Sequence, residues 1–487
     1  MEVALDLVDL LKSANIENYN PDIDRITNLN KSLIENNNDS YDDRLLLSIA
    51  ALVINLDESE IELGFNKSII LKLISNIESV ITSQINEIIH HQDFKEIESI
   101  WLSLQDILNS VPNNSNVILD LLDVTKDELL EDFECNLVDM TGSSLFNKTY
   151  TSEYDQYGGK PYGAIIGLYD FNFNPQDEFI IRSMANLANA NHSPFISQVG
   201  PQFFGCNDIE ELSSIKDLSG ILDHPKYSTW NEFRDTQEAA YVGLTLPKYM
   251  LRVPHKTEFF QESVTSYEKE NFVWGYSSIL FAKNMIKSFI NTGWCQYIRG
   301  PKGGGMISGL PVYSFDFLGH DEVKIPVEFA IPDYKEYELA KCGFMPLVYQ
   351  KGTGNACFFS CQSVKRAGKF VDKFDSQNSE MVTNLSYTLS ITRVAHYIKR
   401  MMRDNIGANA DAAYIEKSLN EWIMKYVTEI NNPDEVSLKL YPFKQAEVTV
   451  KKTQHEIGWY DCEIKVLPHI QFEGMEVMLR LETRLSA

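Results

Sequence analysis

The chain has 487 residues, of which 44% are hydrophobic and 23% are charged, a balance typical of a soluble globular protein with two or three domains. No window approaches the roughly 20 apolar residues of a membrane-spanning helix, so we expect no direct membrane insertion. The net charge of −26 argues against a nucleic-acid partner, because acidic side chains repel phosphates.

Cysteine usage and the first residues indicate the compartment. The seven cysteines are odd in number and lack the spacing of a disulfide framework, which predicts reduced thiols. The opening stretch MEVALDLVDL is acidic where a secretory signal is basic. We therefore expect a cytoplasmic protein.

The acidic charge is concentrated in the first part of the chain. Residues 1–140 carry 28 acidic and 8 basic side chains, a balance of −20, and the remaining residues carry 41 and 35, a balance of −6. Two interpretations are open. The acidic part is either a solvated face that keeps the protein soluble or an exterior layer on an assembly with a nearly neutral interior.

We assign residues 1–60 to an acidic N-terminal helix and an asparagine-rich linker. Residues 4–13 have amphipathic spacing, and residues 13–44 contain eight asparagines, a composition typical of a flexible linker. An isolated helix of about ten residues is marginal in water, so this helix either docks on a partner or packs on its own domain. Its apolar positions include Leu7, Val8, Leu10 and Leu11.

Residues 61–140 are expected to be helical. Isoleucines recur every three or four positions between Asn66 and His91, which predicts a long amphipathic helix, and a second helix is expected from Phe94 to Leu108. The pair either covers a core of its own chain or forms a helix–helix seam with another chain. The seam positions of the first helix are Ile70, Ile74, Ile77, Ile81 and Ile88.

Residues 141–380 alternate between strand-like and helical stretches, which predicts an α/β (mixed α+β) domain. Asn174 and Pro175 carry the signals of a helix start, a capping side chain followed by proline at the first helical position. Strands are expected at 163–169, 241–246 and 323–331, and a helix at 276–291 that stops at Gly293.

The stretch Gly158-Gly159-Lys160-Pro161 resembles a phosphate-binding loop only superficially. It lacks the spacing of a P-loop, and the proline after the lysine has no N–H to offer to a phosphate. A tight turn that leads into a buried strand is the better interpretation.

Residues 381–487 carry a basic helix, expected at 387–406, and three strands with alternating apolar residues. A terminal strand of this kind either pairs within its own chain or joins the sheet of a neighbouring molecule. The alternating positions are Val448, Val450, Ile464, Val466, Val477, Leu479 and Leu481.

Motifs of catalysis are missing from the sequence. There is no GxSxG, HExxH, CxxC or GxGxxG signature, and no carboxylates occur in a motif that identifies a general acid and base. The pair Cys357 and Cys361 is more simply a pair of buried thiols than a metal site, and His90-His91 suits a helix end better than a metal. We therefore expect no enzyme, no cofactor and no metal.

From about Asn66 to its end, the chain resembles the large subunit of the bacterial type VI secretion contractile sheath (the TssC/VipB/IglB family). Many collinear segments carry this resemblance, which makes it more specific than a short motif. It departs from the family at Leu102-Ser103-Leu104, where Arg-Gly-Leu is usual, and in the asparagine-rich linker. The matching segments are Ile85–Trp101, Leu130–Glu134, Tyr157–Phe171, Pro194–Gly205, Trp230–His255, Gly293–Gly305, Gly309–Phe315, Gly343–Phe359, Arg393–Gly407 and Pro468–Met475.

The resemblance implies a structural role in a helical assembly in the bacterial cytoplasm. Family members pair with a small sheath subunit and stack as a tube around an inner tube of hexameric rings. The tube is built on a baseplate, contracts to drive protein secretion, and is recycled by an AAA+ unfoldase of the ClpV type.

The resemblance also implies roles for the elements predicted above. Residues 61–140 would pack with the small subunit, 141–380 would form the middle and outer sheath domain, and 381–487 the inner layer, whose sheet is completed by strands of neighbouring subunits. The helix within residues 1–60 resembles the unfoldase-recognition segment. The basic positions expected to face the inner tube are Arg393, Lys399, Arg400 and Arg403.

Two other hypotheses come from different classes of protein. A soluble α/β enzyme with an unrecognised site would behave as a monomer, and a phage-like tail sheath made of one polypeptide would form tubes without a second subunit.

Overall fold

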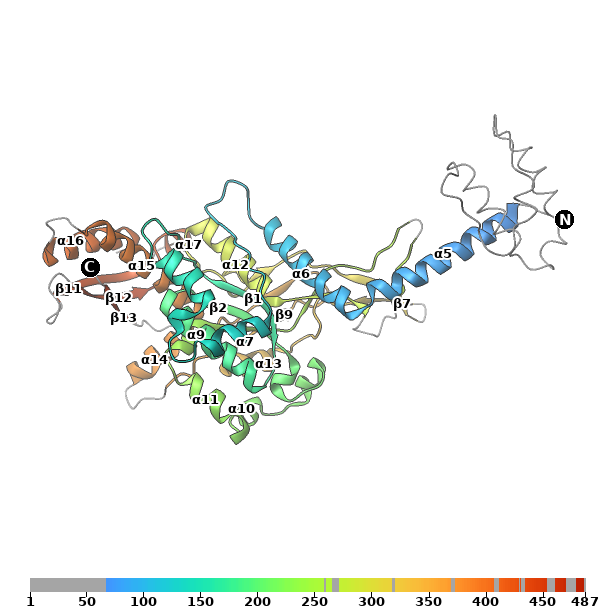
Figure 1. Cartoon of the computed structure of the whole chain (residues 1–487), viewed down its shortest axis with the longest axis horizontal. Coiled ribbons are helices and arrows are strands. Elements are labelled where there is room, and N and C mark those ends of the chain that lie inside the picture. Colours follow the sequence, from blue (N-terminus) through green and yellow to red (C-terminus); the bar gives the residue numbers. More distant parts are fainter. Residues whose placement is uncertain are drawn as a thin grey trace, which may run out of the picture. The chain divides into compact units, whose positions relative to one another are not determined.

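The computed structural model describes residues 67–257, 260–264, 271–317, 320–368, 373–406, 411–428, 430, 434–452, 460–469 and 479–485. The chain divides into two units, one made of residues 1–91 and 255–263 and the other of residues 92–254 and 264–487. Figure 1 shows the elements in chain order. The predicted segment 1–60, with its helix, lies outside the described residues, and the predicted domain boundaries stay a prediction.

The first unit contains α5 (Lys67–Ile89), which confirms the predicted long helix. The segment 255–263 is held to the end of this helix by side chains of the same unit. His90 Nε2 lies 3.3 Å from Glu262 Oε1, and the main-chain N–H of Ser263 donates to Asn86 Oδ1 at 3.1 Å. The paired histidine therefore closes the helix end against a carboxylate.

The second unit is built on a six-stranded sheet in the order β1-β2-β3-β9-β10-β6. The first four strands are parallel, whereas β10 runs antiparallel to both of its neighbours. The bounds are β1 (Ile165–Phe171), β2 (Phe195–Val199), β3 (Val242–Leu246), β9 (Phe344–Tyr349), β10 (Ala356–Phe358) and β6 (Met306–Ile307).

Both faces of this sheet are buried, as is usual for parallel strands connected by helices. Phe195 and Phe344 point into a core shared with the helices α9 and α13, and their neighbours Ile196 and Met345 point into a second core with α12. The mixed α/β fold class predicted from the sequence is thereby confirmed. The helices are α6 (Gln92–Asn109), α7 (Lys126–Cys135), α9 (Pro175–Asn191), α12 (Ser277–Thr292) and α13 (Asp333–Lys341).

Local signals in the sequence were reliable here. Asn174 Oδ1 accepts the N–H of Asp177 at 2.6 Å, with Pro175 at the first helical position of α9. Gly293 ends α12 with a positive φ of 77°, a conformation that glycine adopts without the penalty of a Cβ atom. The turn at Gly158, with φ of 86°, leads into β1 as expected.

One predicted strand is largely wrong. A strand was expected over 323–331, but β8 (His320–Lys324) ends at the second residue of that range and, among the described residues, pairs with β7 (Tyr313–Phe317) alone. Pro326 follows two residues later, and since proline has no N–H it cannot continue a ladder.

Shorter elements complete the central part of the unit. They are η1 (Met140–Gly142), α8 (Ser144–Phe146), the π-helix η2 (Asn147–Tyr154), η3 (Pro201–Phe204), η4 (Ile209–Ser214), α10 (Leu218–Leu222), η5 (Pro225–Tyr227), α11 (Ser228–Arg234), η6 (Glu238–Tyr241), β4 (Tyr249–Met250) and β5 (Trp274–Gly275).

The C-terminal part carries a three-stranded antiparallel sheet in the order β11-β12-β13 and the helices beside it. All three predicted strands are present. Figure 1 shows this sheet beside α15 and α16. The bounds are α14 (Lys373–Val382), α15 (Leu385–Asp404), α16 (Ala412–Ile423), η8 (Met424–Tyr426), α17 (Glu435–Leu440), β11 (Phe443–Lys452), β12 (Tyr460–Pro468) and β13 (Leu479–Leu485).

Candidate assembly surfaces

The residues predicted to pair between subunits lie together in the C-terminal sheet. β12 is the central strand, with Ile464 opposite Val448 on one side and opposite Leu481 on the other. Val448, Val450, Ile464 and Val466 are at most 6% exposed and pack in a core with α15 and α16, so their side chains are not available to another molecule. Val477 lies outside the described residues.

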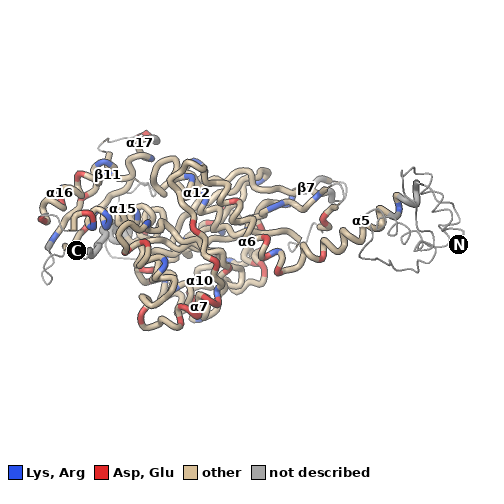
Figure 2. Tube along the Cα trace, turned by 45° about the horizontal axis from the view of Figure 1, so that its top comes forward, with Lys and Arg blue, Asp and Glu red and all other residues tan. Residues whose placement is uncertain are grey.

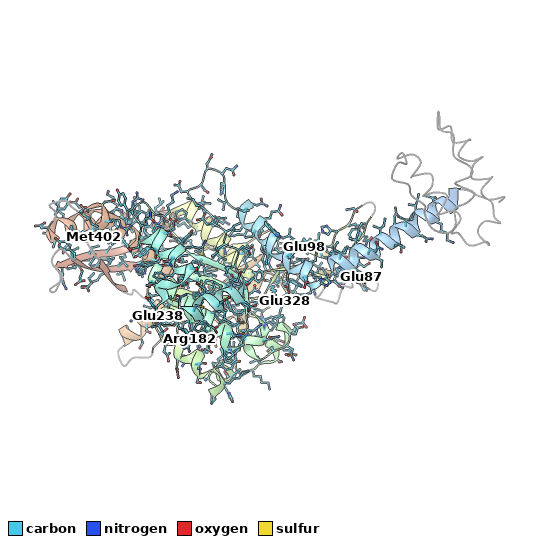
Figure 3. All side chains as sticks on the ribbon, viewed as in Figure 1. Glu87, Glu98, Arg182, Glu238, Glu328 and Met402 are labelled. Carbon is cyan, nitrogen blue, oxygen red and sulfur yellow. The ribbon has the colours of Figure 1, made fainter. Side chains whose placement is uncertain are left out.

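The helix α15 joins this sheet to the central domain. Its first half places Leu385 and Leu389 in the core of the six-stranded sheet, and its second half places Val394 and Ile398 in the core of the C-terminal sheet. Met402, labelled in Figure 3, packs against the second of these cores. One helix therefore belongs to both cores.

The basic residues of α15, shown in blue in Figure 2, are largely engaged within the chain. Lys399 Nζ lies 2.9 Å from Asp155 Oδ1, and Arg403 donates to the carbonyl of Gln156 at 2.8 Å. The guanidinium of Arg393 lies over the ring of Phe289, 4.4 Å from its centroid. Arg400 is exposed. The sequence predicted four cations for an outside partner and did not show that three of them contact their own chain.

Sequence reasoning missed the aromatic cluster that holds α15 against η2 and α9. Phe146 at the end of α8 stacks on Tyr150 of the π-helix, with centroids 4.7 Å apart, and Tyr150 meets Tyr154 in a tilted pair at 5.3 Å. Lys399 Nζ lies 3.6 Å from the centroid of Tyr154. Long π-helical stretches are rare in proteins, and those that occur are often found at functional sites. This segment is therefore an unusual point of contact for α15. Aromatic residues four apart, at 146, 150 and 154, are the sequence signal that could have indicated it.

Two histidines complete this cluster, which we call the α15 joint and define by Tyr150, Tyr154, His192, His396 and Lys399. His396 Nε2 lies 2.9 Å from the carbonyl of Asn191, and His192 Nδ1 lies 3.3 Å from the hydroxyl of Tyr241. Burial lowers the pKa of His192 to about 4, and burial, together with Lys399 and Arg393, lowers the pKa of His396 to about 4. Both histidines are therefore neutral near pH 7.

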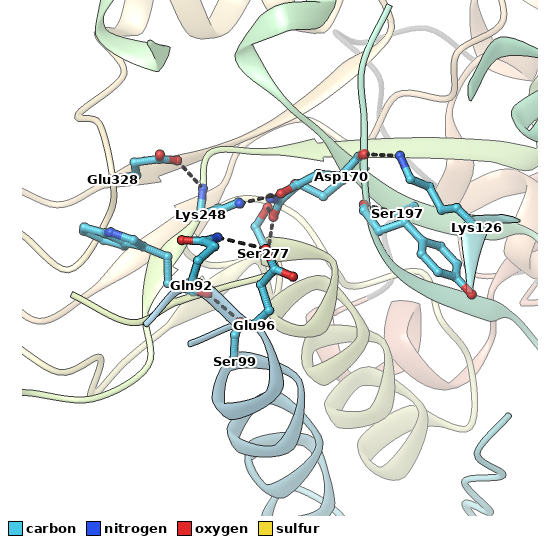
Figure 4. Close-up of polar contacts among 12 residues, drawn as sticks. Gln92, Glu96, Ser99, Lys126, Asp170, Ser197, Lys248, Ser277 and Glu328 are labelled. Atoms are coloured by element: carbon cyan, nitrogen blue, oxygen red, sulfur yellow. Dashed lines mark hydrogen bonds and ion pairs between the residues drawn. The ribbon is translucent and has the colours of Figure 1, made fainter. Parts of the chain in front are cut away.

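A polar network lies at the carboxyl ends of the parallel strands (Figure 4). The ammonium of Lys248 forms an ion pair with Asp170 at the end of β1. The main-chain N–H of Lys248 donates to the carboxylate of Glu328 at 3.4 Å. Burial acts to lower the pKa of Lys248, but the carboxylates of Asp170 and Glu328 outweigh it and raise the pKa. Gln198 Nε2 donates to Asp170 at 2.6 Å, and its Oε1 accepts the N–H of Ser277 at 2.8 Å.

In open parallel sheets this edge is where ligands usually bind. Here the polar groups satisfy one another and fasten β1 and β2 to the start of α12. Within the described ranges, no three His, Cys, Asp or Glu side chains are placed to hold a metal ion. Cys357 and Cys361 are buried free thiols, and burial raises their pKa values to about 11 and about 12.

The helices α5 and α6 carry apolar residues on the outside of their own units. In α5, which Figure 2 shows as mostly uncharged, Ile74, Ile77, Ile81 and Ile88 are 37% to 59% exposed. The helical backbone at Ile70 is described, but its side chain lies outside the described residues. The four predicted seam positions of α5 whose side chains are described are thus exposed in this chain.

α6 has two different faces, an inner one of mostly small side chains and an outer one of large apolar side chains. Ser99, Ser103 and Ile107 are buried against the body of the second unit, where Ser99 Oγ donates to the carbonyl of Trp274 at 2.6 Å. The outward face carries larger residues with a 3–4 spacing, and its two most exposed members are Ile97 at 58% and Trp101 at 66%. The set is Phe94, Ile97, Trp101, Leu104 and Leu108, which we call the α6 seam. The sequence prediction placed Ile107 in phase with Phe94, Ile97, Trp101 and Leu104, but the structure buries Ile107 on the inner face, and Leu108 continues the outward face instead.

Among the described residues, no helix combines the length and apolar character needed to cross a membrane.

Known proteins resemble the chain over most of its length. A family model described as the EvpB/VC_A0108 tail sheath N-terminal domain matches residues 71–365, and a second, the EvpB/VC_A0108 tail sheath gpW/gp25-like domain, matches residues 374–485. The type VI secretion system sheath protein TssC1 of Pseudomonas aeruginosa is 35% identical over 427 residues, which cover 85% of each chain.

Two solved structures show a weaker likeness. The baseplate of the anti-feeding prophage contains a chain with 11% identity and a TM-score of 0.33, covering 77% of this chain and 81% of that one. Its helical sheath in the contracted state gives 12% identity and a TM-score of 0.32, covering 67% and 68%. These scores are too low to carry an argument.

The family matches confirm the resemblance inferred from the sequence and the structural role that it implies. The chain belongs to the VipB (EvpB/VC_A0108) tail sheath family and is a structural sheath subunit.

Proposed function

We propose that this chain is the large subunit of the contractile sheath of a type VI secretion system in the bacterial cytoplasm. With a small sheath subunit it builds a helical tube around an inner tube of hexameric rings, and contraction of that tube drives protein secretion. The observation that carries the proposal is the pair of tail-sheath domain matches over residues 71–365 and 374–485. Neither a catalytic role nor a sheath made of one polypeptide is favoured by these matches.

The small subunit docks on the exposed apolar faces of the helical segment 61–140. The isoleucine seam of α5 is one such face, exposed at Ile74, Ile77, Ile81 and Ile88, and the α6 seam is the other; Ile70 belongs to the predicted seam by its spacing alone. Apolar residues spaced alternately three and four positions apart form a stripe along one side of a helix, and a second helix can pack against this stripe. α6 buries small serines on its own body and leaves its phenylalanine, tryptophan and leucine outside, which supports a helical partner at this face.

We expect the double variant Ile97→Ala/Trp101→Ala to lose at least about 30-fold in affinity for the small subunit, because exposed aromatic anchors dominate such interfaces with about 2 kcal/mol or more. The free energy of unfolding of the chain alone should change by less than about 1 kcal/mol, since both side chains are largely exposed. Titration of the labelled small subunit measures the affinity. Asn109→Ala, an exposed position at the end of the same helix and outside the α6 seam, is the matched control. Unchanged affinity in the double variant would contradict the role of the α6 seam.

Neighbouring large subunits join through the main chain of the C-terminal sheet. Since β12 is central, the two edges of the sheet lie along β11 and β13, and sheet edges are the places where further strands can add. Backbone pairing of this kind holds subunits together while they rotate, because its bonds do not depend on particular side chains.

The inner tube faces the basic side of α15. Arg393, Lys399 and Arg403 contact their own chain, so Arg400, which is exposed, is the residue best placed for this contact. The other proposed partners are the baseplate and a ClpV-type AAA+ unfoldase. Leu7, Val8, Leu10 and Leu11, proposed for unfoldase recognition, lie outside the described residues.

The test is negative-stain electron microscopy of the chain produced alone and together with the small subunit. We expect hollow, ridged tubes only when both subunits are present. Tubes from the chain alone would indicate a single-polypeptide sheath, and a monomer that ignores the small subunit would overturn the assembly role.

A further inference from the structure

The outer edge of β11 is occupied by side chains of α16. The main-chain N–H of Val448 donates to Asn420 Oδ1 at 2.9 Å, and the carbonyl of Val448 accepts from Asn420 Nδ2 at 2.7 Å. The N–H of Val450 donates to Glu416 Oε2 at 2.9 Å. These are main-chain groups that point away from β12, because alternate residues of an antiparallel strand turn their N–H and C=O to opposite sides.

The Asn420 side chain reproduces the pairing of a neighbouring strand. An amide carries one carbonyl and one N–H donor in a plane, as a peptide group does, and here both bond to the two main-chain groups of one residue. A residue in an antiparallel partner strand would make the same two bonds.

The position of α16 is fixed by its packing. Ile415, Leu419 and Ile423 are at most 4% exposed in the core that also contains Val448 and Val450. The two capping residues, Glu416 and Asn420, are one helical turn apart on the same helix, so they lie on one side of it. The cap is therefore part of the folded C-terminal domain.

We propose that Glu416 and Asn420 close the β11 edge to strand addition, so that a strand of a neighbouring subunit adds only beside β13. The proposal rests on the inter-subunit strand pairing of the proposed function and assigns a direction to it. With one edge closed, the C-terminal sheet, as far as its residues are described, offers one docking edge, along β13. Unassembled subunits then cannot use both edges of this sheet to form open-ended, misdirected β-chains.

The test compares the wild-type chain with Glu416→Ala/Asn420→Ala. In the variant the main-chain amides of Val448 and Val450 lose their acceptors, and hydrogen exchange of the peptide containing them should accelerate about tenfold or more. The variant chain alone should self-associate in sedimentation velocity, where the wild type should not. Co-produced with the small subunit, it should give fewer tubes and more irregular aggregates.

Matched variants distinguish the loss of the hydrogen bonds to β11 from a general loss of folding. Glu416→Gln keeps an oxygen acceptor for Val450 and should behave as the wild type, and Glu421→Ala removes an exposed charge from the same helix without touching β11. If the double variant does not fold, Asn420→Asp, which keeps the shape and removes the N–H donor to Val448, takes its place.

The outcomes also distinguish this inference from the sheath role. The edge-closing role of Glu416 and Asn420 would be refuted if the wild type forms tubes and the double variant stays monomeric or forms tubes more readily. That result would leave the sheath role intact. If the wild type forms no tubes with the small subunit but the double variant self-associates, the edge-closing role would be supported and the sheath role would be refuted.

Discussion

We expect the free energy of unfolding to fall by up to about 4 kcal/mol between about pH 7.5 and about pH 5, owing to His192 and His396. The pKa of each is about 4 in the folded chain and 6.5 in the absence of the fold. Between these values the unfolded chain binds more protons than the folded chain, so stability is complete above pH 6.5 and decreases as the pH falls toward 4.

Denaturant unfolding at a series of pH values measures this effect, and non-titrating variants isolate it. His396→Gln keeps an N–H for the carbonyl of Asn191, and His192→Asn suits the left-handed backbone there, where φ is 52°. The double variant should lose most of the pH dependence in this range. His224→Asn, at an exposed position, should retain it. Equal pH dependence in wild type and double variant would show that the α15 joint is not the acid-sensitive element.

Removal of residues 474–487 should abolish tube formation and leave binding of the small subunit intact. The deletion takes away β13, which pairs with β12 over seven residues from Tyr460 to Val466. The α5 and α6 faces proposed for the small subunit are distant in sequence and remain. Co-purification with the small subunit and negative-stain images, taken on the same samples, measure the two properties.

A matched control for this deletion is the substitution Leu102→Ala on α6, away from the C-terminal sheet. It should leave tubes intact. Tubes formed by the truncated chain would contradict the role of the terminal strand, and loss of the small subunit as well would point to general unfolding rather than to a specific assembly defect.

Much of the fold follows from short-range signals in the sequence. The alternation of Val448 and Val450 with polar residues predicted β11, and the asparagine and proline before Asp177 predicted the start of α9. The β8 prediction failed because Pro326 interrupts a stretch whose apolar pattern alone resembles a strand.

The assembly surfaces were harder to predict, because packing between residues far apart in the sequence determines which faces are exposed. The spacing of Ile97 and Trp101 identified a helix but did not reveal which face meets the body of the protein, which Ser99 and Ile107 settle. The partners of Lys399 lie more than 200 residues away, and no local pattern predicts that a cation bonds to Asp155 rather than to another molecule.

The membership of α15 in two cores has a mechanical consequence. Its 20 residues span about 30 Å as a continuous helix, with Leu389 anchored at the central sheet and Ile398 at the C-terminal sheet. A pull on the terminal strands is carried along this rod to the central sheet, and Lys399 on its side lies over the rings of Tyr150 and Tyr154. If the C-terminal sheet forms the inner layer of a tube, as the family resemblance implies, a torque applied there passes through α15 to the central sheet.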